Sequence, residues 1–172
     1  MDKAELRREI LCRRAERSES ARAAASEAIT AHLLALPEVN SAKTVGCYVA
    51  MRGEPDTKQL IASLLARKVR VLIPVGRDEP NWADFEAPDI ALGASSIATA
   101  DFLIVPGLAV AYDGTRLGRG GGYYDKVLEH FSSPTCIALF SDEVLPKVPS
   151  EPHDQKVRMV ATELGVARLQ LL

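Results

Sequence analysis

The chain is organised around one stretch, Arg116-Leu117-Gly118-Arg119-Gly120-Gly121-Gly122-Tyr123-Tyr124-Asp125. Four of the eleven glycines of the chain fall within five positions of this stretch, and two arginines are interleaved with them. Glycine backbone lets N–H groups come close to the oxygens of an anion, and arginine adds charge-assisted hydrogen bonds. The stretch therefore predicts an anion-binding loop, with Arg116 and Arg119 as its charged contacts.

The patterns on both sides predict the elements that present this loop. Upstream, the apolar run 102–105 is closed by Pro106-Gly107, which is typical of a buried strand that ends at a breaker. Asp113-Gly114 then predicts a tight hairpin turn. Downstream, apolar side chains over 124–131 follow helical spacing, so a helix begins at or just after the last glycine. The positive end of its dipole favours an anion in the loop.

The loop matches neither of the familiar nucleotide motifs. It lacks the Lys-Ser/Thr that closes a P-loop, and its glycines are not spaced as in the dinucleotide fingerprint. A flexible glycine linker is the alternative, but a linker is not expected to carry arginines and flanking strand and helix patterns.

Three segments, Pro106-Gly107, Asp113-Gly114 and the stretch 116–125, together resemble the signature of the 5-formyltetrahydrofolate cyclo-ligases, also called 5,10-methenyltetrahydrofolate synthetases. The match is long and without gaps. The resemblance implies one α/β domain over residues 1–172, with three α/β/α layers around a Rossmann-like, mostly parallel sheet similar to the NagB/RpiA/CoA-transferase fold. It also implies conversion of 5-formyltetrahydrofolate to 5,10-methenyltetrahydrofolate, with Mg²⁺ as cofactor and ATP consumed to ADP and phosphate.

Composition agrees with one compact domain and a small-molecule partner. A chain of 172 residues that is 47% hydrophobic has room for one sizeable core. A formal net charge of -2 gives no electrostatic case for nucleic acid or an anionic membrane, and we expect a monomer. Cys12, Cys47 and Cys136 lack the spacing of a disulfide or zinc framework. With no membrane span or signal-peptide pattern in the sequence, we expect a cytoplasmic protein.

Two helices are expected over residues 2–17 and 21–36, with Ser18 and Ser20 as candidate caps between them. The first segment is more polar than a core helix, which by itself favours a solvated helix laid across the domain. The resemblance adds a role, because Lys3 and Arg7 match a Lys-x-x-x-Arg pattern that helps to bind ATP. On a helix these side chains lie one turn apart on the same face.

A strand at 45–50, a helix beginning after Asp56 or Thr57, and a strand at 69–75 predict a βαβ unit. Ligands of open α/β sheets bind outside the carboxyl ends of the strands, and Glu54 follows such an end. From the sequence alone, a solvent-exposed carboxylate without a ligand is the more common role for a glutamate in such a loop. The resemblance instead makes Met51 and Glu54 folate contacts.

The stretch 77–99 is the least readable, and by the resemblance it is shorter than the family's usual stretch. We expect Trp82 to offer an apolar wall for the pterin, although a lone tryptophan is more often a residue at the edge of the core. Further strands are expected at 135–140 and, as the last one, near 157–162. His153 and Asp154 are not expected to pair, because neighbours in an extended segment point to opposite sides.

The remaining site assignments come from the resemblance. Asp125 and Asp154 are the expected Mg²⁺ ligands, although Asp125 in the first turn of a helix also stabilises it without any ligand. Arg119 and Tyr124 are the expected catalytic residues, and no nucleophile is assigned. The expected ATP-binding residues are Lys3, Arg7, Arg116, Gly118, Arg119, Gly120, Gly121, Gly122, Tyr123, Tyr124 and Asp125.

Two other functions remain open from the sequence. One is a folate- or nucleotide-binding protein without catalysis, in which the shortened stretch 77–99 has removed ring closure. The other is a sugar-phosphate enzyme on a similar α/β scaffold, because a fold alone does not decide function. Such an enzyme would not need ATP, and Lys3 and Arg7 would then have no role.

Overall fold

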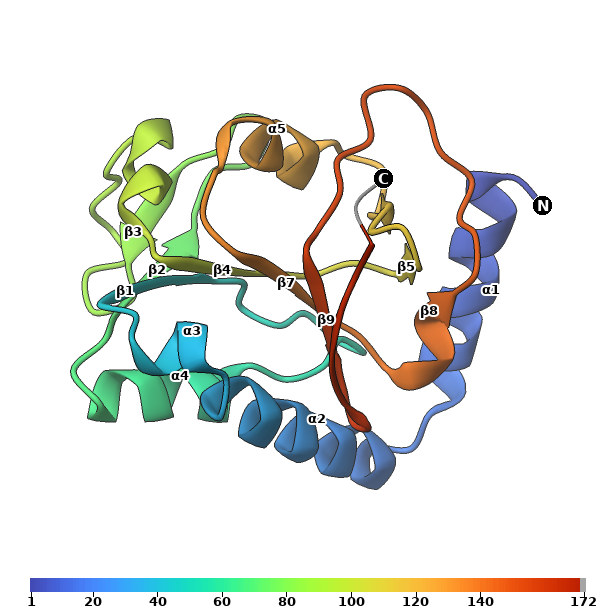
Figure 1. Ribbon diagram of the computed structural model, residues 1–172, viewed down its shortest axis with the longest axis horizontal. Helices are drawn as coiled ribbons and strands as arrows, with labels where there is room; N and C mark the ends of the chain where they lie inside the picture. Colours follow the sequence, from blue (N-terminus) through green and yellow to red (C-terminus); the bar gives the residue numbers. More distant parts are fainter. Residues whose placement is uncertain (171–172) are drawn as a thin grey trace.

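A mostly parallel sheet crosses the centre of the computed structural model, which describes residues 1–170 (Figure 1). Its strands lie in the order β10, β9, β7, β4, β1, β2, β3. Their bounds are β1 (Thr44–Cys47), β2 (Arg70–Pro74), β3 (Trp82–Asp84), β4 (Phe102–Val105), β7 (Thr135–Ala138), β9 (Met159–Thr162) and β10 (Gly165–Arg168). The five central strands run parallel, and β3 and β10 form antiparallel edges.

Burial on both faces explains why the central strands have continuous apolar sequences. All four residues of β4 are fully buried, and β4 pairs with β1 on one side and β7 on the other. Position 46 in β1 requires glycine for a steric reason, since a Cβ there would lie 2.7 Å from Ile97 Cδ1 and from Leu103 Cδ1. The missing side chain thus lets the 3-10 helix η1 (Ala94–Thr99) lie close to the sheet.

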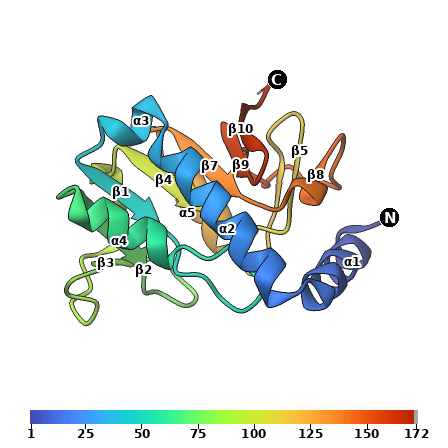
Figure 2. The same cartoon turned by 90° about the horizontal axis from the view of Figure 1, so that it is seen from below.

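Helices cover both faces of the sheet, and the predicted three-layer α/β/α architecture is confirmed. One face carries α2 (Glu19–Leu34), α3 (Pro37–Asn40) and α4 (Lys58–Ala66), as Figure 2 shows from below. The other carries α5 (Tyr123–His130) together with η1. Ser18 caps α2, because its side chain accepts the N–H of Ala21 at 3.1 Å, whereas Ser20 lies inside the helix.

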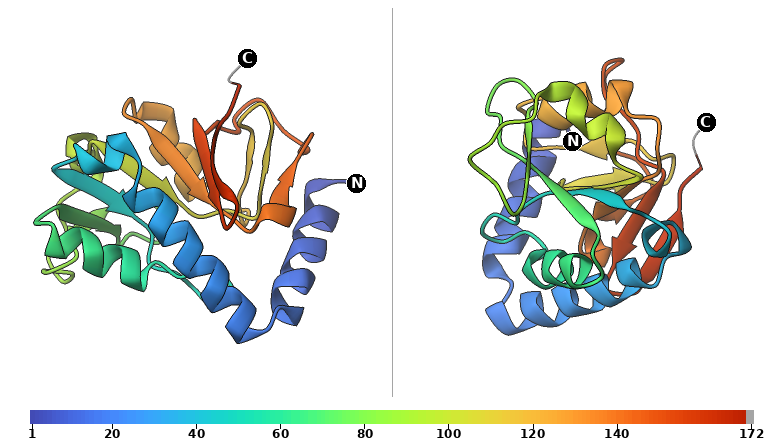
Figure 3. Two further views of the ribbon diagram at one scale, coloured as in Figure 1. Left: turned by 60° about the horizontal axis from the view of Figure 1, so that its bottom comes forward. Right: turned by 90° about the vertical axis from the view of Figure 1, so that its left-hand side faces the viewer.

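A second, smaller sheet joins the N-terminal helix to the rest of the molecule. Its strands lie in the order β6 (Arg116–Leu117), β5 (Ala109–Ala111), β8 (Val144–Leu145). The helix α1 (Lys3–Glu16) covers it at the right-hand end of Figure 3, left. Leu6 and Ile10 of α1 share a separate core with apolar residues of this sheet, so α1 is a packed helix with a narrow apolar stripe.

The predicted hairpin is confirmed within this smaller sheet. Strand β5 pairs antiparallel with β6, and Gly114 adopts φ +90°, which favours glycine over residues with a Cβ. The Asp113 side chain accepts the N–H of Thr115 at 3.0 Å and so fixes the turn. The loop that follows β7 carries the short 3-10 helix η2 (Ser141–Glu143), which leads into β8.

The structure corrects the prediction for the last strand and shows which elements the stretch 77–99 contains. The strand near 157–162 is not the last one, because the chain turns at Glu163-Leu164 and returns as β10, which begins at Gly165 with φ +140°. Residues 77–99 contain the edge strand β3 and the helix η1. Within residues 1–170, no helix has the length and apolar character that a membrane crossing requires.

Candidate active site

A cleft of about 440 Å³ lies where α1, the glycine loop and the loops after β1, β2 and β4 meet. For an open α/β sheet this is the expected place, outside the carboxyl ends of the parallel strands. One residue expected from the sequence to contribute, Trp82, does not line the cleft. The expected residues that do line it are Lys3, Arg7, Met51, Glu54, Arg116, Gly118, Arg119, Gly120, Gly121, Gly122, Tyr123, Tyr124, Asp125 and Asp154.

The N-terminal half of α1 presents two cations, Lys3 and Arg7, to the cleft. A capping box fixes its start, since Asp2 accepts the N–H of Glu5 at 2.8 Å and Glu5 accepts that of Asp2 at 3.2 Å. Arg7 Nε donates to the carbonyl oxygen of Gly118 at 2.8 Å. Lys3 Nζ lies 2.6 Å from Asp154 Oδ2. The N-terminal helix is thereby attached to the glycine loop and to the acidic side of the cleft.

The glycine loop has the backbone conformation that its sequence suggests. Gly120 adopts φ +112° and Gly122 φ +73°, and Gly122 is the N-cap of α5. Beneath the loop lies Arg116, only 7% exposed. Its Nε donates to the carbonyl of Pro106 at 2.8 Å, and its guanidinium lies 5.3 Å from the ring centroid of Tyr124. Arg116 therefore braces the floor of the loop while it lines the cleft.

Glu54 forms the opposite wall together with the loop that follows β1. It is 2% exposed, and its Oε1 accepts the N–H of Met51 at 2.7 Å. Its Oε2 lies 3.7 Å from Nη2 of Arg119, which reaches across from the glycine loop. Arg22 of α2 donates to the Glu54 carbonyl at 2.7 Å. This contact fixes the loop from behind, while Met51 stays 53% exposed at the rim.

The aromatic residues at the start of α5 separate the cleft from the core. The Tyr124 hydroxyl is buried and has no hydrogen-bond partner within residues 1–170. Burial raises its pKa well above the usual value, so the hydroxyl keeps its proton. Trp82 lies behind the two tyrosines, with ring centroids 6.4 Å from Tyr123 and 6.5 Å from Tyr124. Because its side chain is fully buried there, Trp82 does not form a wall for a ligand, and that expectation is wrong.

The acidic side of the cleft contains Asp125 and Asp154. Asp125 Oδ1 accepts the N–H of Gln155 at 3.2 Å. Burial opposes ionisation of Asp154, but the hydrogen bonds from Lys3 and from the Glu151 N–H, together with the charge of Lys3, outweigh it and lower the pKa of Asp154 below its ordinary value. His153 also lines the cleft, and its Nε2 lies 3.5 Å from Asp154 Oδ1. The expectation that these two do not pair is wrong because residues 151–154 form a turn, closed by the Asp154 N–H to the Glu151 carbonyl.

A buried ion pair that sequence reasoning missed attaches α1 to the cleft. Arg14 Nε lies 2.7 Å from Glu143 Oε2, and Arg14 Nη2 lies 2.9 Å from Glu143 Oε1. The same Nη2 donates to the carbonyl of Gly107 at 2.8 Å. Arg77 was missed as well, although it follows β2 as Glu54 follows β1 and lines the same cleft. The position of Arg77 after a parallel strand was the available signal.

Comparison with known proteins identifies the family of the chain. A model of the 5-formyltetrahydrofolate cyclo-ligase family matches residues 1–163. The chain belongs to the 5-formyltetrahydrofolate cyclo-ligase family. A curated cyclo-ligase from Mycolicibacterium smegmatis is 34% identical over an alignment of 191 positions, which covers 98% of this chain and 97% of the relative.

Two solved structures share the fold of this cyclo-ligase family member. The 5,10-methenyltetrahydrofolate synthetase from Aquifex aeolicus superposes with a TM-score of 0.85 at 29% identity, over 99% of this chain and 94% of that one. The synthetase from Mycoplasma pneumoniae gives a TM-score of 0.82 at 24% identity, over 95% and 99%. Membership in the cyclo-ligase family makes the chain an enzyme, a ligase of folate metabolism, and implies ATP as its co-substrate.

Proposed function

We propose that this chain catalyses the ATP- and magnesium-dependent cyclisation of 5-formyltetrahydrofolate to 5,10-methenyltetrahydrofolate, with release of ADP and phosphate. One observation carries the proposal beyond family membership: Arg7 of α1 donates to Gly118 of the glycine loop, 111 positions away in the chain. A cation pair and a glycine loop thereby face one cleft, as polyphosphate binding requires. As part of the proposal, we expect the enzyme to act as a monomer.

The proposed reaction proceeds in two steps. The formyl oxygen attacks the γ-phosphorus of ATP, and the bond from that phosphorus to the β,γ-bridging oxygen breaks to release ADP. The N10 amine of the folate then attacks the formyl carbon. The bond from this carbon to the phosphorylated oxygen breaks, phosphate leaves, and N10 loses its proton. Phosphorylation is needed first because a formamide oxygen is a poor leaving group.

The residues of the glycine loop would supply position and charge rather than a nucleophile. Phosphoryl transfer asks a protein mainly for alignment and charge neutralisation. Backbone N–H groups of residues 118–122 would cradle the phosphates, with Lys3 and Arg7 on the other side. Arg119 would stabilise charge on the transferring phosphoryl group. The unpartnered hydroxyl of Tyr124, protonated because it is buried, would donate to a substrate oxygen.

The folate would lie against the loop that follows β1. Glu54 is buried and already positioned by the Met51 N–H, so its second oxygen, 3.7 Å from Arg119 Nη2, would meet the pterin at little entropic cost. Met51 would contact the folate from the rim. Arg119 reaches Glu54 in the free enzyme, which places the phosphate-binding and folate-binding groups next to each other.

The donor set of the cleft fits a magnesium ion that enters with ATP. Mg²⁺ binds proteins through one or two carboxylates, keeps several waters and takes oxygens from substrate phosphates. Asp125 and Asp154 line the cleft beside the glycine loop, whereas residues 1–170 contain no group of three His, Cys, Asp or Glu that could hold a metal alone. Asp125 and Asp154 would hold the ion, which supplies positive charge to the phosphates.

Formation of the methenyl product, followed by its absorbance, tests the proposal. Purified protein and 5-formyltetrahydrofolate are expected to give product only when MgATP is present. A matched reaction with ATP and excess chelator is expected to give none. Binding of the folate without product would favour a folate-binding protein without catalysis. Absence of folate binding would contradict the proposed substrate.

A further inference from the structure

Arg77 differs from the other cations of the cleft because its side chain has no partner in the described part of the chain. Lys3, Arg7, Arg116 and Arg119 each contact a carboxylate or a carbonyl oxygen. Arg77 is exposed and lines the cleft, yet within residues 1–170 it forms no hydrogen bond or ion pair. An unpaired guanidinium at the mouth of a binding cleft has its full donor fork available for an anion.

The strand order places Arg77 away from the cations of α1. It follows β2, which lies beside β1 and next to the edge strand β3. In Figures 1 and 3, β2 and β3 are at the end of the molecule opposite α1. The glycine loop, the Glu54 wall and the β2 loop therefore follow one another along the cleft. The phosphates of ATP are assigned to the α1 side, so Arg77 faces the part of the cleft left for the second substrate.

The rim next to Arg77 suits the distal part of a folate. Val49 and Met51, in the loop after the neighbouring strand β1, line the cleft with half-exposed apolar side chains, 50% and 53% exposed. A folate has an apolar benzoyl ring between its pterin and its glutamate, and the glutamate carries free carboxylates. An apolar rim followed by an unpaired guanidinium repeats that order of chemical groups.

We propose that Arg77 binds the glutamate carboxylate of the folate where its tail leaves the cleft. Arg77 thereby sets the preference of the enzyme for glutamylated substrates. The exposed position leaves room for a tail of any length to continue into solvent. This inference rests on the proposed function, because it assigns the folate to this side of the cleft.

Direct binding of two folates to the Arg77→Gln variant tests the proposal. The probes are 5-formyltetrahydrofolate and its neutral analogue, in which an amide replaces the glutamate, both titrated without ATP. The variant should bind the glutamyl folate about threefold to tenfold more weakly, as expected for a partly exposed charge pair, and the amide with unchanged Kd. The difference in Kd for the glutamyl folate between wild type and Arg77→Gln should shrink as the salt concentration is raised. Arg77→Lys should recover part of the lost affinity.

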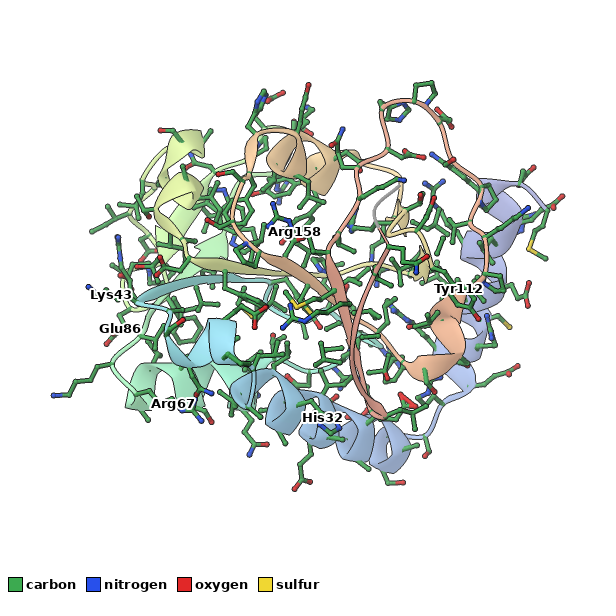
Figure 4. The ribbon with its side chains drawn as sticks, viewed as in Figure 1. His32, Lys43, Arg67, Glu86, Tyr112 and Arg158 are labelled. Atoms are coloured by element: carbon green, nitrogen blue, oxygen red, sulfur yellow. The ribbon has the colours of Figure 1, made fainter. Side chains whose placement is uncertain are left out.

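Lys43→Gln is the matched control for net charge. Lys43 precedes β1 at the opposite end of the strands, on the left of Figure 4, and does not line the cleft. This variant should bind both folates as the wild type does. Equal weakening of both folates by Arg77→Gln, a rise in the KM for MgATP, or no change in any affinity would overturn the proposal. Because binding needs no turnover, a wild type that binds folate but makes no product would contradict only the proposed reaction.

Discussion

The buried pair of Arg14 and Glu143 gives the sharpest test of how α1 is attached. The two residues are 5% and 2% exposed, and two short contacts join them. In the Arg14→Met variant the carboxylate would stay buried with only the N–H of Phe140, at 3.0 Å, as partner. Breaking a buried pair in this way costs about 3–5 kcal/mol. For a chain of this size that loss lowers the Tm by roughly 6–20 °C.

The loss should depend on pH in a defined direction. Burial raises the pKa of Glu143, and Arg14 only partly offsets this, so removal of Arg14 raises that pKa further. The folded variant then binds a proton more tightly than the unfolded chain does, and its stability falls as the pH rises through the folded pKa. The difference in unfolding free energy between wild type and Arg14→Met should therefore be smaller at pH 5 than at pH 8.

Urea unfolding at both pH values measures these differences. Arg13→Met is the matched control, since Arg13 pairs with Asp142 at 3.5 Å on the surface and should cost no more than about 1 kcal/mol. Adding Glu143→Leu to Arg14→Met should restore much of the loss, because no unpaired charge then remains. A loss no larger than that of the control, or a larger loss at pH 5, would refute the reasoning.

Four further variants test the site and its support. Arg119→Ala should lower kcat about 100-fold or more with an unchanged Tm, because a charge-stabilising group is lost; near-normal turnover would remove this role. Asp154→Asn should need about 10- to 100-fold more magnesium for half-maximal rate, and an unchanged magnesium titration would end the metal assignment. Gly120→Ala forces a side chain to adopt φ +112°. It should cost about 1–3 kcal/mol of stability and raise the KM for MgATP, so an unaltered KM and Tm would speak against a strained loop. Trp82→Ala should lose about 3–5 kcal/mol in urea unfolding, and a loss below about 1 kcal/mol would mean that this side chain is not part of the core.

Local patterns were enough to predict the elements around the glycine loop. Asp113-Gly114 fixed the hairpin because glycine is favoured at the φ of +90° that the turn adopts. The apolar run 102–105 and the helical spacing after Gly122 matched β4 and α5 closely. Each of these signals lies within a few residues of the element that it determines. Contacts with distant parts of the chain therefore do not change the prediction.

Contacts between distant segments were not readable in the same way. Arg14 occurs in a polar helix, and nothing nearby in the sequence indicates that Glu143 neutralises it 129 positions later. Trp82 was misplaced because a three-residue edge strand carries too little periodicity to show which face its side chain takes. β10 was missed for the same reason, since a strand of four residues that begins with a glycine resembles a loop.

The position of α1 has a consequence for how the protein is made. This helix leaves the ribosome 111 residues before Gly118 and 129 residues before Glu143, the partners that seat it. Contacts between residues so far apart in the sequence form late. The helix α1 therefore cannot pack in its final position while the sheet is being synthesised. The apolar stripe of α1 is narrow, consisting of Leu6 and Ile10, so the undocked helix exposes little apolar surface during synthesis. A nascent chain therefore lacks the contact between α1 and the glycine loop until synthesis is nearly complete.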